Sequence, residues 1–311
     1  MTSLAPRVVL VTRRTEFDRL LATHATRGQA EFFLEKRGQS LAELELQKER
    51  QLKAVNHAKQ AVPDDWSVAQ VLRDDLDRFL FAADDIVVAI GQDGLVANLA
   101  KYLTGQSVIG VTPDPDRTEG VLTPVIADTL PKLLPRVAAG DMDLRRLTMV
   151  EAKLDGEQTL AALNELFIGH RSHQSALYEL SFEGKTEFQS SSGVIVSTGT
   201  GLTGWARSIM AATHRQVDFA PDERRAVYFA REPWPSRTTG NELAFGEIGP
   251  STSVCLTSRM NDGGAIFADG IEQDFLRFDW GTKAQIGISE RTLNLVKGSW
   301  RMKNTCTLAS A

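Results

Sequence analysis

A buried strand runs into a glycine-rich turn at Ile86-Val87-Val88-Ala89-Ile90-Gly91-Gln92-Asp93-Gly94. A second strand does the same at Val194-Ile195-Val196-Ser197-Thr198-Gly199-Thr200-Gly201-Leu202-Thr203-Gly204. Turns of this kind let backbone N–H groups approach phosphates closely. Only the first turn carries a carboxylate, Asp93, and phosphoryl transfer needs a carboxylate near the phosphates. The pair therefore predicts chemistry at residue 93 and binding at residues 199 to 204.

Composition and charge exclude several classes of protein. The chain has 311 residues, of which 42% are hydrophobic and 24% charged, enough for roughly two domains with their own cores. The net charge of -5 argues against nucleic acid or an anionic membrane as partner. Cys255 and Cys306 form no C-x-x-C pair, so we expect neither zinc nor a disulfide framework. No run approaches the roughly 20 apolar residues of a membrane span, and no signal-peptide pattern is present, so we expect a cytoplasmic protein.

The first half of the chain alternates strands and helices. Apolar strands are predicted at residues 7–11, 86–90 and 107–111. Helical spacing of apolar residues predicts helices over 16–61, broken near Gly28 and Gly38, over 68–81, and from residue 95 to 103. This alternation indicates a Rossmann-like open parallel sheet with its ligand site at the carboxyl ends of the strands.

The pattern changes after Pro124. A helix around residues 130–137 precedes short alternating segments that predict antiparallel strands, with a hairpin turn at Glu183-Gly184. Further strands are predicted near 226–230, 253–257, 265–268, 275–279 and 284–289. The second half is therefore expected to form a β-rich, sandwich-like domain.

Other motif matches point to different functions. Gly199 to Gly204 fits the G-x-G-x-x-G pattern of dinucleotide-binding folds, with Glu232 as the acid after the next strand, but no dehydrogenase machinery accompanies it. Gly184-Lys185-Thr186 looks like the end of a P-loop, yet it falls in the predicted hairpin. His170 and His173 lack a third metal ligand nearby, which favours an ordinary loop.

Three separate motifs resemble the signatures of the NAD kinases. They are Gly91-Gln92-Asp93-Gly94, Asn164-Glu165, and Ser192-Gly193-Val194-Ile195-Val196-Ser197-Thr198-Gly199-Thr200-Gly201 followed by Trp205, in the family's order. The chain is most similar to the mitochondrial-type members, which have counterparts of Val108-Ile109-Gly110-Val111, Asp114-Pro115-Asp116-Arg117-Thr118-Glu119-Gly120, Leu166-Phe167-Ile168-Gly169 and Arg231-Glu232-Pro233. The resemblance covers most of the chain.

The resemblance implies a fold and a reaction. It implies an α/β domain over 1–140, a β-rich dinucleotide-binding domain over 141–289, a tail of about 290–311 that returns to the first domain, and a homodimer. The reaction is transfer of a phosphoryl group from ATP or polyphosphate to the adenosine 2′-hydroxyl of NAD, which gives NADP. Mg²⁺ or another divalent cation is expected, held through Asp93 and the ATP phosphates.

Site residues follow from the same resemblance. Asp93 is the expected catalytic residue; its alternative role is to cap the helix that follows. Arg231 and Arg237 are expected to counter phosphate charge, although surface ion pairs explain them equally well. Other expected nucleotide contacts are Gly91, Gln92 and Gly94 at the phosphates, Asn164 and Glu165 at the adenosine, and Thr198, Thr200, Gly201 and Thr203 along the dinucleotide.

The chain also departs from the family pattern. Gln92 stands where the first motif commonly has a second glycine, which implies a differently shaped phosphate cradle. Leu202 replaces a common serine, and Ser191-Ser192-Gly193 replaces the Gly-Asp-Gly of the larger bacterial group. Two alternatives stay open beside the NAD kinase: a related kinase that phosphorylates a lipid or sugar hydroxyl, and a noncatalytic NAD-sensing module.

Overall fold

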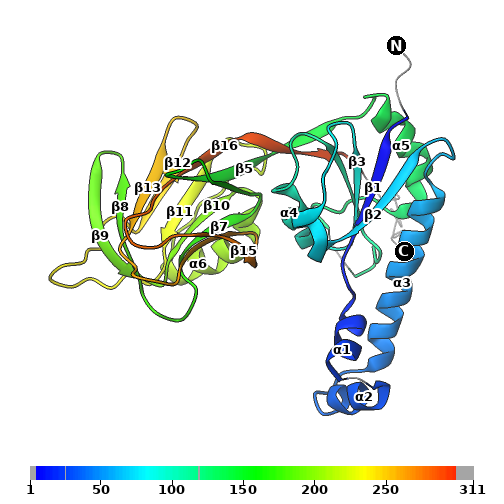
Figure 1. The fold of residues 1–311 in the computed structure, drawn as a ribbon, viewed down its shortest axis with the longest axis horizontal. Coiled ribbons are helices and arrows are strands. Elements are labelled where there is room, and N and C mark those ends of the chain that lie inside the picture. Colours follow the sequence, from blue (N-terminus) through cyan, green and yellow to red (C-terminus); the bar gives the residue numbers. More distant parts are fainter. Residues whose placement is uncertain (1–4, 25, 118–119, 299–311) are drawn as a thin grey trace, which may run out of the picture. The chain divides into compact units, whose positions relative to one another are not determined.

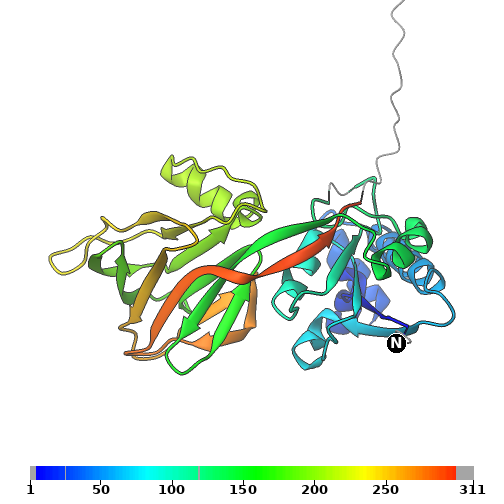
Figure 2. The same cartoon turned by 90° about the horizontal axis from the view of Figure 1, so that it is seen from above.

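The computed structural model describes residues 5–24, 26–117 and 120–298. The chain divides into two compact units (Figures 1 and 2). Among the described residues, unit 1 comprises 5–24, 26–96, 106–117, 120–144 and 295–298, and unit 2 comprises 97–105 and 145–294. The chain passes between the units inside helix α4 (Asp93–Ala100) and inside strands β5 (Leu144–Leu154) and β16 (Lys283–Val296). No helix among the described residues is long and apolar enough to cross a membrane.

Unit 1 contains the expected parallel sheet. Its strands are β1 (Arg7–Thr12), β2 (Ser67–Leu72), β3 (Ile86–Ile90) and β4 (Ser107–Val111), in the order β2-β1-β3-β4 with parallel pairing throughout. Every residue of β3 is buried, as in a sheet covered on both faces. The chain moves from β1 to β2 on one side and then to β3 on the other. The carboxyl ends of β1 and β3 therefore form a topological switch point, where open α/β sheets bind ligands.

Helices cover this sheet. They are α1 (Glu16–His24), α2 (Arg27–Glu35), α3 (Leu41–Gln60) and α5 (Leu130–Ala138), with the short 3₁₀ helices η1 (Arg73–Arg78) and η2 (Ala127–Thr129). Val55 of α3 and Leu134 of α5 join strand residues such as Val88 in one core cluster. Figure 1 shows α1 and α2 at one end of α3, where Phe17, Leu34 and Leu41 form a small separate cluster.

A segment after β4 is pinned against the sheet. Val125 pairs with Val111, and the Val125 N–H donates to the carbonyl of Gly110 at 3.1 Å. A Cβ at Gly110 would lie 1.8 Å from the Leu122 carbonyl oxygen, so only glycine allows this approach. The backbone of residues 121–123 is thereby held beside the carboxyl end of β3.

Unit 2 is a two-sheet β structure. One sheet has the order β12-β11-β10-β7-β14-β15 and is antiparallel. Its strands are β7 (Glu165–His170), β10 (Val194–Thr198), β11 (Ala226–Ala230), β12 (Phe245–Ile248), β14 (Gly264–Ala268) and β15 (Ile271–Arg277). The other strands are β8 (Ala176–Phe182), β9 (Lys185–Ser191) and β13 (Ser253–Ser258), in the order β16-β13-β8-β9, and β6 (Thr159–Ala162), which pairs with β5.

The core of unit 2 contains buried residues of both sheets. Tyr178 and Leu256 from one sheet and Ile168 and Val196 from the other belong to a single buried cluster. Helix α6 (Trp205–Thr213), with the 3₁₀ helix η3 (Gly201–Thr203) before it, packs through Ala206 against Val227 and Phe229 on the opposite face of the β10–β11 pair (Figure 2). This arrangement confirms the predicted α/β plus β-rich fold class.

Several local predictions are wrong. Residues 68–81 form β2 and a 3₁₀ helix, although a helix was expected. Gly28 lies inside α2, which begins at Arg27 after the N-cap Thr26, so Gly28 does not break a helix. The strand before Gly199 pairs antiparallel with both neighbours, which excludes the parallel βαβ unit of a dinucleotide-binding G-x-G-x-x-G motif. Most of the expected C-terminal tail lies outside the described residues; within them, Lys297 N–H donates to the carbonyl of Asp143 in unit 1 at 3.0 Å.

Candidate functional site

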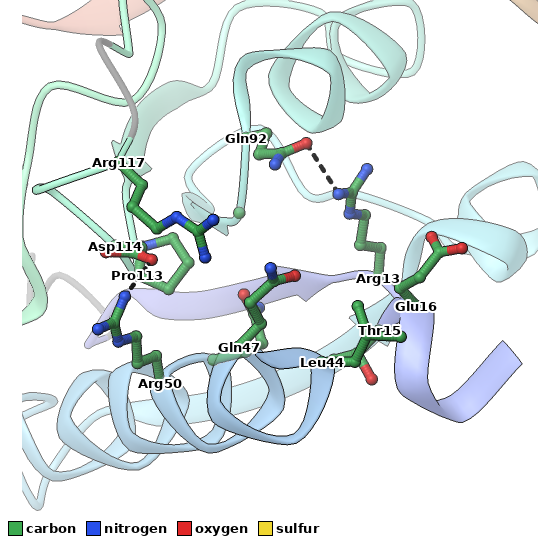
Figure 3. A pocket seen from close by; sticks show the side chains of 12 residues that line it. Arg13, Thr15, Glu16, Leu44, Gln47, Arg50, Gln92, Pro113, Asp114 and Arg117 are labelled. Carbon is green, nitrogen blue, oxygen red and sulfur yellow. Dashed lines mark hydrogen bonds and ion pairs between the residues drawn. The ribbon is translucent and has the colours of Figure 1, made fainter. Parts of the chain in front are cut away.

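A pocket of about 500 Å³ opens at the switch point of unit 1 (Figure 3). Arg13 follows β1, and the turn Gly91-Gln92 follows β3. The side chain of Arg13 donates to Gln92 Oε1 at 2.8 Å. The opposite wall carries Arg117, and Arg50 of α3 forms an ion pair with Asp114 at 2.5 Å. The predicted phosphate turn therefore lies at the edge of a pocket with three arginines.

Asp93 accepts four hydrogen bonds from residues 121–123. Its Oδ1 accepts from Leu122 N at 3.0 Å, Thr123 N at 3.1 Å and Thr123 Oγ1 at 3.0 Å, and its Oδ2 accepts from Val121 N at 2.9 Å. The side chain clamps this segment and makes no bond to its own helix, so the alternative of a helix cap is not what the structure shows. A carboxylate oxygen has two lone pairs; three donors share Oδ1, whereas Oδ2 accepts a single hydrogen bond. Oδ2 therefore keeps room for one further donor.

Asn164 and Glu165 lie at the start of β7, where a buried carboxylate holds their backbone. Asp269 accepts from the N–H groups of Leu163 at 3.0 Å, Asn164 at 2.7 Å and Glu165 at 3.2 Å. Asp269 and Gly270 both have positive φ, of 50° and 72°, and form the turn between β14 and β15. Asn98 donates to the Asp269 carbonyl at 2.7 Å. The backbone of residues 163–165 is therefore held in place by the turn that carries Asp269.

The two carboxyl groups of this corner, Glu165 and Asp269, both have raised pKa values. Burial, followed by the negative charge of Asp269, raises the pKa of Glu165 to about 7. Burial raises the pKa of Asp269 to about 6, although its backbone hydrogen bonds and the charge of Lys101 oppose the shift. Lys101 itself pairs with Asp274 at 2.6 Å. A carboxylate poised near neutrality at a predicted binding position is a feature of functional sites.

The turn after β10 packs directly against this corner. Thr198 N donates to the Asn164 carbonyl at 2.9 Å, and Thr198 Oγ1 donates to the Leu163 carbonyl at 2.5 Å. A Cβ at Gly201 would lie 2.3 Å from the Asn164 carbonyl oxygen. We expected Thr198 and Gly201 to line a dinucleotide. In the structure, the Thr198 hydroxyl is bonded within the protein, and Gly201 admits the backbone of Asn164.

Thr200 has a different environment from its neighbours. Its side-chain oxygen is buried and has no hydrogen-bond partner among the described residues. Thr203 is exposed and donates to the Thr200 carbonyl at 3.2 Å. A buried hydroxyl without a partner costs free energy unless something satisfies it. Thr200 is therefore the residue of this turn whose environment fits a bound ligand.

The two expected arginines are in different settings. Arg231 is part-buried, with its guanidinium 4.9 Å from the centre of the Trp205 ring and a bond of 3.3 Å to the Ser192 carbonyl. Trp205 is parallel to Phe167 at 5.9 Å. Arg237 is exposed, and its side chain forms no ion pair with another described residue. The structure therefore joins Arg231, but not Arg237, to the β7 and β10 side of the site.

We find no metal centre built by the protein alone. Within residues 5–24, 26–117 and 120–298, no group of three or more His, Cys, Asp or Glu side chains is placed to hold an ion. His170 Nδ1 instead bonds to Ser172 Oγ at 2.9 Å. Mg²⁺ in nucleotide enzymes is commonly held by one or two carboxylates together with substrate phosphates. Asp93 fits that donor set as a single carboxylate.

Comparison with known proteins agrees with these motifs. No family model matches the chain. The rat (Rattus norvegicus) protein "NAD kinase 2, mitochondrial" is 24% identical over 352 aligned positions, which cover 86% of this chain and 82% of that protein. An NAD kinase of Ralstonia nicotianae is 30% identical over 131 positions, 40% of this chain and 43% of the relative. The chain is similar to NAD kinases in sequence.

Solved NAD kinase structures have the same fold. Yeast NADH kinase complexed with NADH superimposes with a TM-score of 0.57 at 12% identity, over 96% of this chain and 85% of that one. An NAD kinase from Archaeoglobus fulgidus in complex with ATP gives 0.55 at 18% identity, over 94% and 93%. The NAD kinase resemblance drawn from the motifs is thus confirmed in sequence and in fold.

Sequence reasoning missed two parts of this NAD kinase-like site. Asp269 was not among the expected site residues, yet it organises the Asn164-Glu165 corner. Asp-Gly is a strong hairpin signal and could have located the turn, but not the direction of the carboxylate. Arg13 was also missed. Its position directly after β1, next to a β3 turn at a switch point, is the signal that could have found it.

Proposed function

We propose that the chain is an ATP-dependent NAD kinase. The observation that carries the proposal is the similarity to an NAD kinase across 86% of the chain, together with motifs that lie beside a pocket and in a buried corner. The fold shared with an NADH-bound and an ATP-bound kinase supports it. The arginine-lined pocket beside Gly91 and Gln92 suits a phosphoryl donor, and the corner of Asn164, Glu165 and Thr200 suits NAD.

The reaction forms one bond and breaks one. The adenosine 2′-oxygen of NAD bonds to the terminal phosphorus of ATP, the bond from that phosphorus to the bridging oxygen breaks, ADP leaves, and the hydroxyl proton is lost. Such transfers depend on alignment and charge neutralisation. Asp93 Oδ2 has the free acceptor position that orients the hydroxyl and receives its proton. Mg²⁺, where bound, neutralises donor phosphates; we place it with those phosphates and Asp93.

In the NAD corner, amide and carboxylate groups recognise adenosine. Glu165 is positioned to accept hydrogen bonds from a ribose diol, and the Asn164 amide offers both a donor and an acceptor to a base edge. Thr200 supplies an unused hydroxyl, and Arg231 supplies a cation held against Trp205. Arg237, as an exposed phosphate contact, stays a prediction, as do the homodimer and the cytoplasmic location.

The test is NADP formation by the full chain. NAD, ATP and Mg²⁺ are incubated with the protein, and NADP is measured with a dehydrogenase specific for it. We expect NADP and an equal amount of ADP to form. A lipid or sugar phosphorylated in place of NAD would identify the related kinase instead.

A noncatalytic NAD sensor is the second candidate, and the bonding of Asp93 favours it. A carboxylate that already accepts four hydrogen bonds has a complete structural role without any chemistry. NAD binding measured by calorimetry, with no ADP released at any concentration of ATP, would select the sensor over the kinase.

A further inference from the structure

Gln92 occupies the position at which this chain departs from the glycine pattern of its first motif, and its side chain has a defined partner. It lies at the carboxyl end of β3, and Arg13 lies at the carboxyl end of the neighbouring strand β1. The 2.8 Å hydrogen bond from Arg13 to Gln92 Oε1 links the two ends across the switch point (Figure 3). A glycine at 92 would leave Arg13 without this bond.

The arginines of the pocket differ in how their charge is balanced. Arg50 is neutralised by Asp114 at 2.5 Å. Arg13 has the neutral Gln92 as its side-chain partner, and neither Arg13 nor Arg117 forms an ion pair with a carboxylate in the described part of the chain. Glu16 also lines the pocket, but Figure 3 shows its carboxylate turned away from the space between Arg13 and Arg117. Among the described residues, two guanidinium groups therefore face the cavity without a carboxylate in ion-pair contact, and Glu16 acts on Arg13 only through its charge at longer range.

The surroundings of Arg13 favour the binding of an anion beside its guanidinium. The side chain is half-buried, and burial together with the nearby cations Arg19 and Arg73 lowers the pKa of its guanidinium. Arginine nevertheless stays charged in proteins. A partly desolvated cation near other cations is stabilised by a ligand that brings negative charge. Guanidinium groups match phosphate oxygens in charge and in geometry.

We propose that Arg13, held by Gln92, and Arg117 bind the polyphosphate chain of the phosphoryl donor in the switch-point pocket. The inference rests on the proposed function and deepens it, because it assigns donor recognition to Arg13 and Arg117, which were not among the expected site residues. Gln92 acts as a positioning residue: it touches Arg13 and sets the direction of the guanidinium. The phosphate chain is the recognised group, whether it belongs to ATP or to inorganic polyphosphate.

The experiment measures binding separately from turnover. The full chain is titrated calorimetrically with ATP, with inorganic tripolyphosphate and with NAD, for wild type, Arg13→Ala, Arg13→Lys, Arg117→Ala and Gln92→Gly. Arg78→Ala is the matched control, because Arg78 is an exposed arginine of unit 1 that does not line the pocket. Thermal unfolding of each variant reports whether it folds.

Arg13→Ala is expected to weaken ATP and tripolyphosphate alike by roughly 10- to 100-fold, as for a lost charge-assisted hydrogen bond. Gln92→Gly removes the group that orients Arg13 but leaves the guanidinium charge in the pocket, and it is expected to weaken both by about 2- to 10-fold. Arg13→Lys should keep part of the affinity, and NAD affinity should stay unchanged throughout. Arg78→Ala should match wild type for all three ligands.

Two results would overturn the inference. One is ATP and tripolyphosphate affinity within about twofold of wild type in folded Arg13→Ala and Arg117→Ala. The other is loss of ATP affinity alone, because Arg13 would then contact the nucleoside. A wild type that binds ATP through Arg13 but makes no NADP contradicts only the proposed function. NADP formation with a KM for ATP insensitive to Arg13→Ala contradicts only this inference.

Discussion

At the residue scale, the burial of Glu165 affects both the stability of the protein and the proposed binding of NAD. Its pKa of about 7 means that the folded protein holds a proton there at pH values where an exposed glutamate has lost it. The ionised form accepts hydrogen bonds, and the protonated form loses part of that capacity. Binding of a ribose diol at this position is therefore expected to depend on pH near neutrality.

We predict that the KM for NAD rises as the pH falls below about 7 in the wild type. Glu165→Gln should have a high KM with little dependence on pH from 6 to 8, because its amide does not titrate. Steady-state kinetics over this range provide the measurement, with Glu183→Gln in the β8–β9 hairpin as control. A wild-type KM for NAD that is flat over the same range would contradict the role of Glu165.

The same shift predicts an effect on stability. A raised pKa favours the protonated folded state, so this contribution to the free energy of unfolding is complete below about pH 4.5 and is lost as the pH rises through about 7. Glu165→Gln should therefore stabilise the apo protein at pH 8 by an amount on the order of 2 kcal/mol, with little effect at pH 4. Urea unfolding at the two pH values tests this, and equal effects at both would contradict it.

At the scale of elements, the turn after β10 depends on a glycine that lets the backbone of another segment approach closely. Gly201 has the Asn164 carbonyl oxygen 2.3 Å from the place of a Cβ, whereas Gly28 in α2 has no atom within 4 Å of that place. We predict that Gly201→Ala lowers the free energy of unfolding by about 1–3 kcal/mol through overpacking. Gly28→Ala should raise it by about 0.5 kcal/mol, because alanine favours helix. Urea unfolding of both variants is the measurement, and equal effects would contradict this account.

Strong local patterns allowed most elements to be predicted. The strand at 86–90 is entirely apolar, and the hairpin at Glu183-Gly184 has the positive φ values of 48° and 77° that its sequence suggests. The error at residues 68–81 has a physical cause. Val68, Val71 and Leu76 are spaced as on a helix face, but the backbone of β2 pairs along its length with β1. Tertiary pairing there overrides local propensity.

The candidate site was predictable in its motif residues but not in the side-chain contacts between them. Motif spacing predicted that Asp93 follows one buried strand and that Asn164 and Glu165 begin another, as the structure has them; their roles in a site stay predictions. Side-chain partners were not predictable, because they come from segments distant in sequence: Asp93 bonds to residues 121–123, and Asp269 bonds to residues 163–165. Thr198 and Thr200 carry the same hydroxyl group. Only the packing around each one decides that the Thr198 hydroxyl is hydrogen-bonded and the Thr200 hydroxyl has no partner among the described residues.

At the scale of the whole molecule, the account assigns the two substrates to different units. Hydrogen exchange measured by mass spectrometry can separate them. ATP is expected to slow exchange at residues 13–17 of unit 1, beside the pocket that holds Arg13. NAD is expected to slow exchange at residues 163–165 and 198–204 of unit 2. Protection of the same peptides by both ligands, or of neither set, would contradict this assignment.

The most direct measurement of the central claim follows the terminal phosphate of ATP. Full-length wild type and Asp93→Asn are incubated with NAD, Mg²⁺ and ATP labelled at that phosphate, and Thr123→Val serves as the control that removes one bond to Asp93 without removing its charge. The account predicts label on the 2′-position of NADP for wild type and Thr123→Val. For Asp93→Asn it predicts a loss of roughly 10³-fold or more in kcat, with ATP still bound. Label that never reaches NAD, or a folded Asp93→Asn that transfers it at the wild-type rate, would contradict the account.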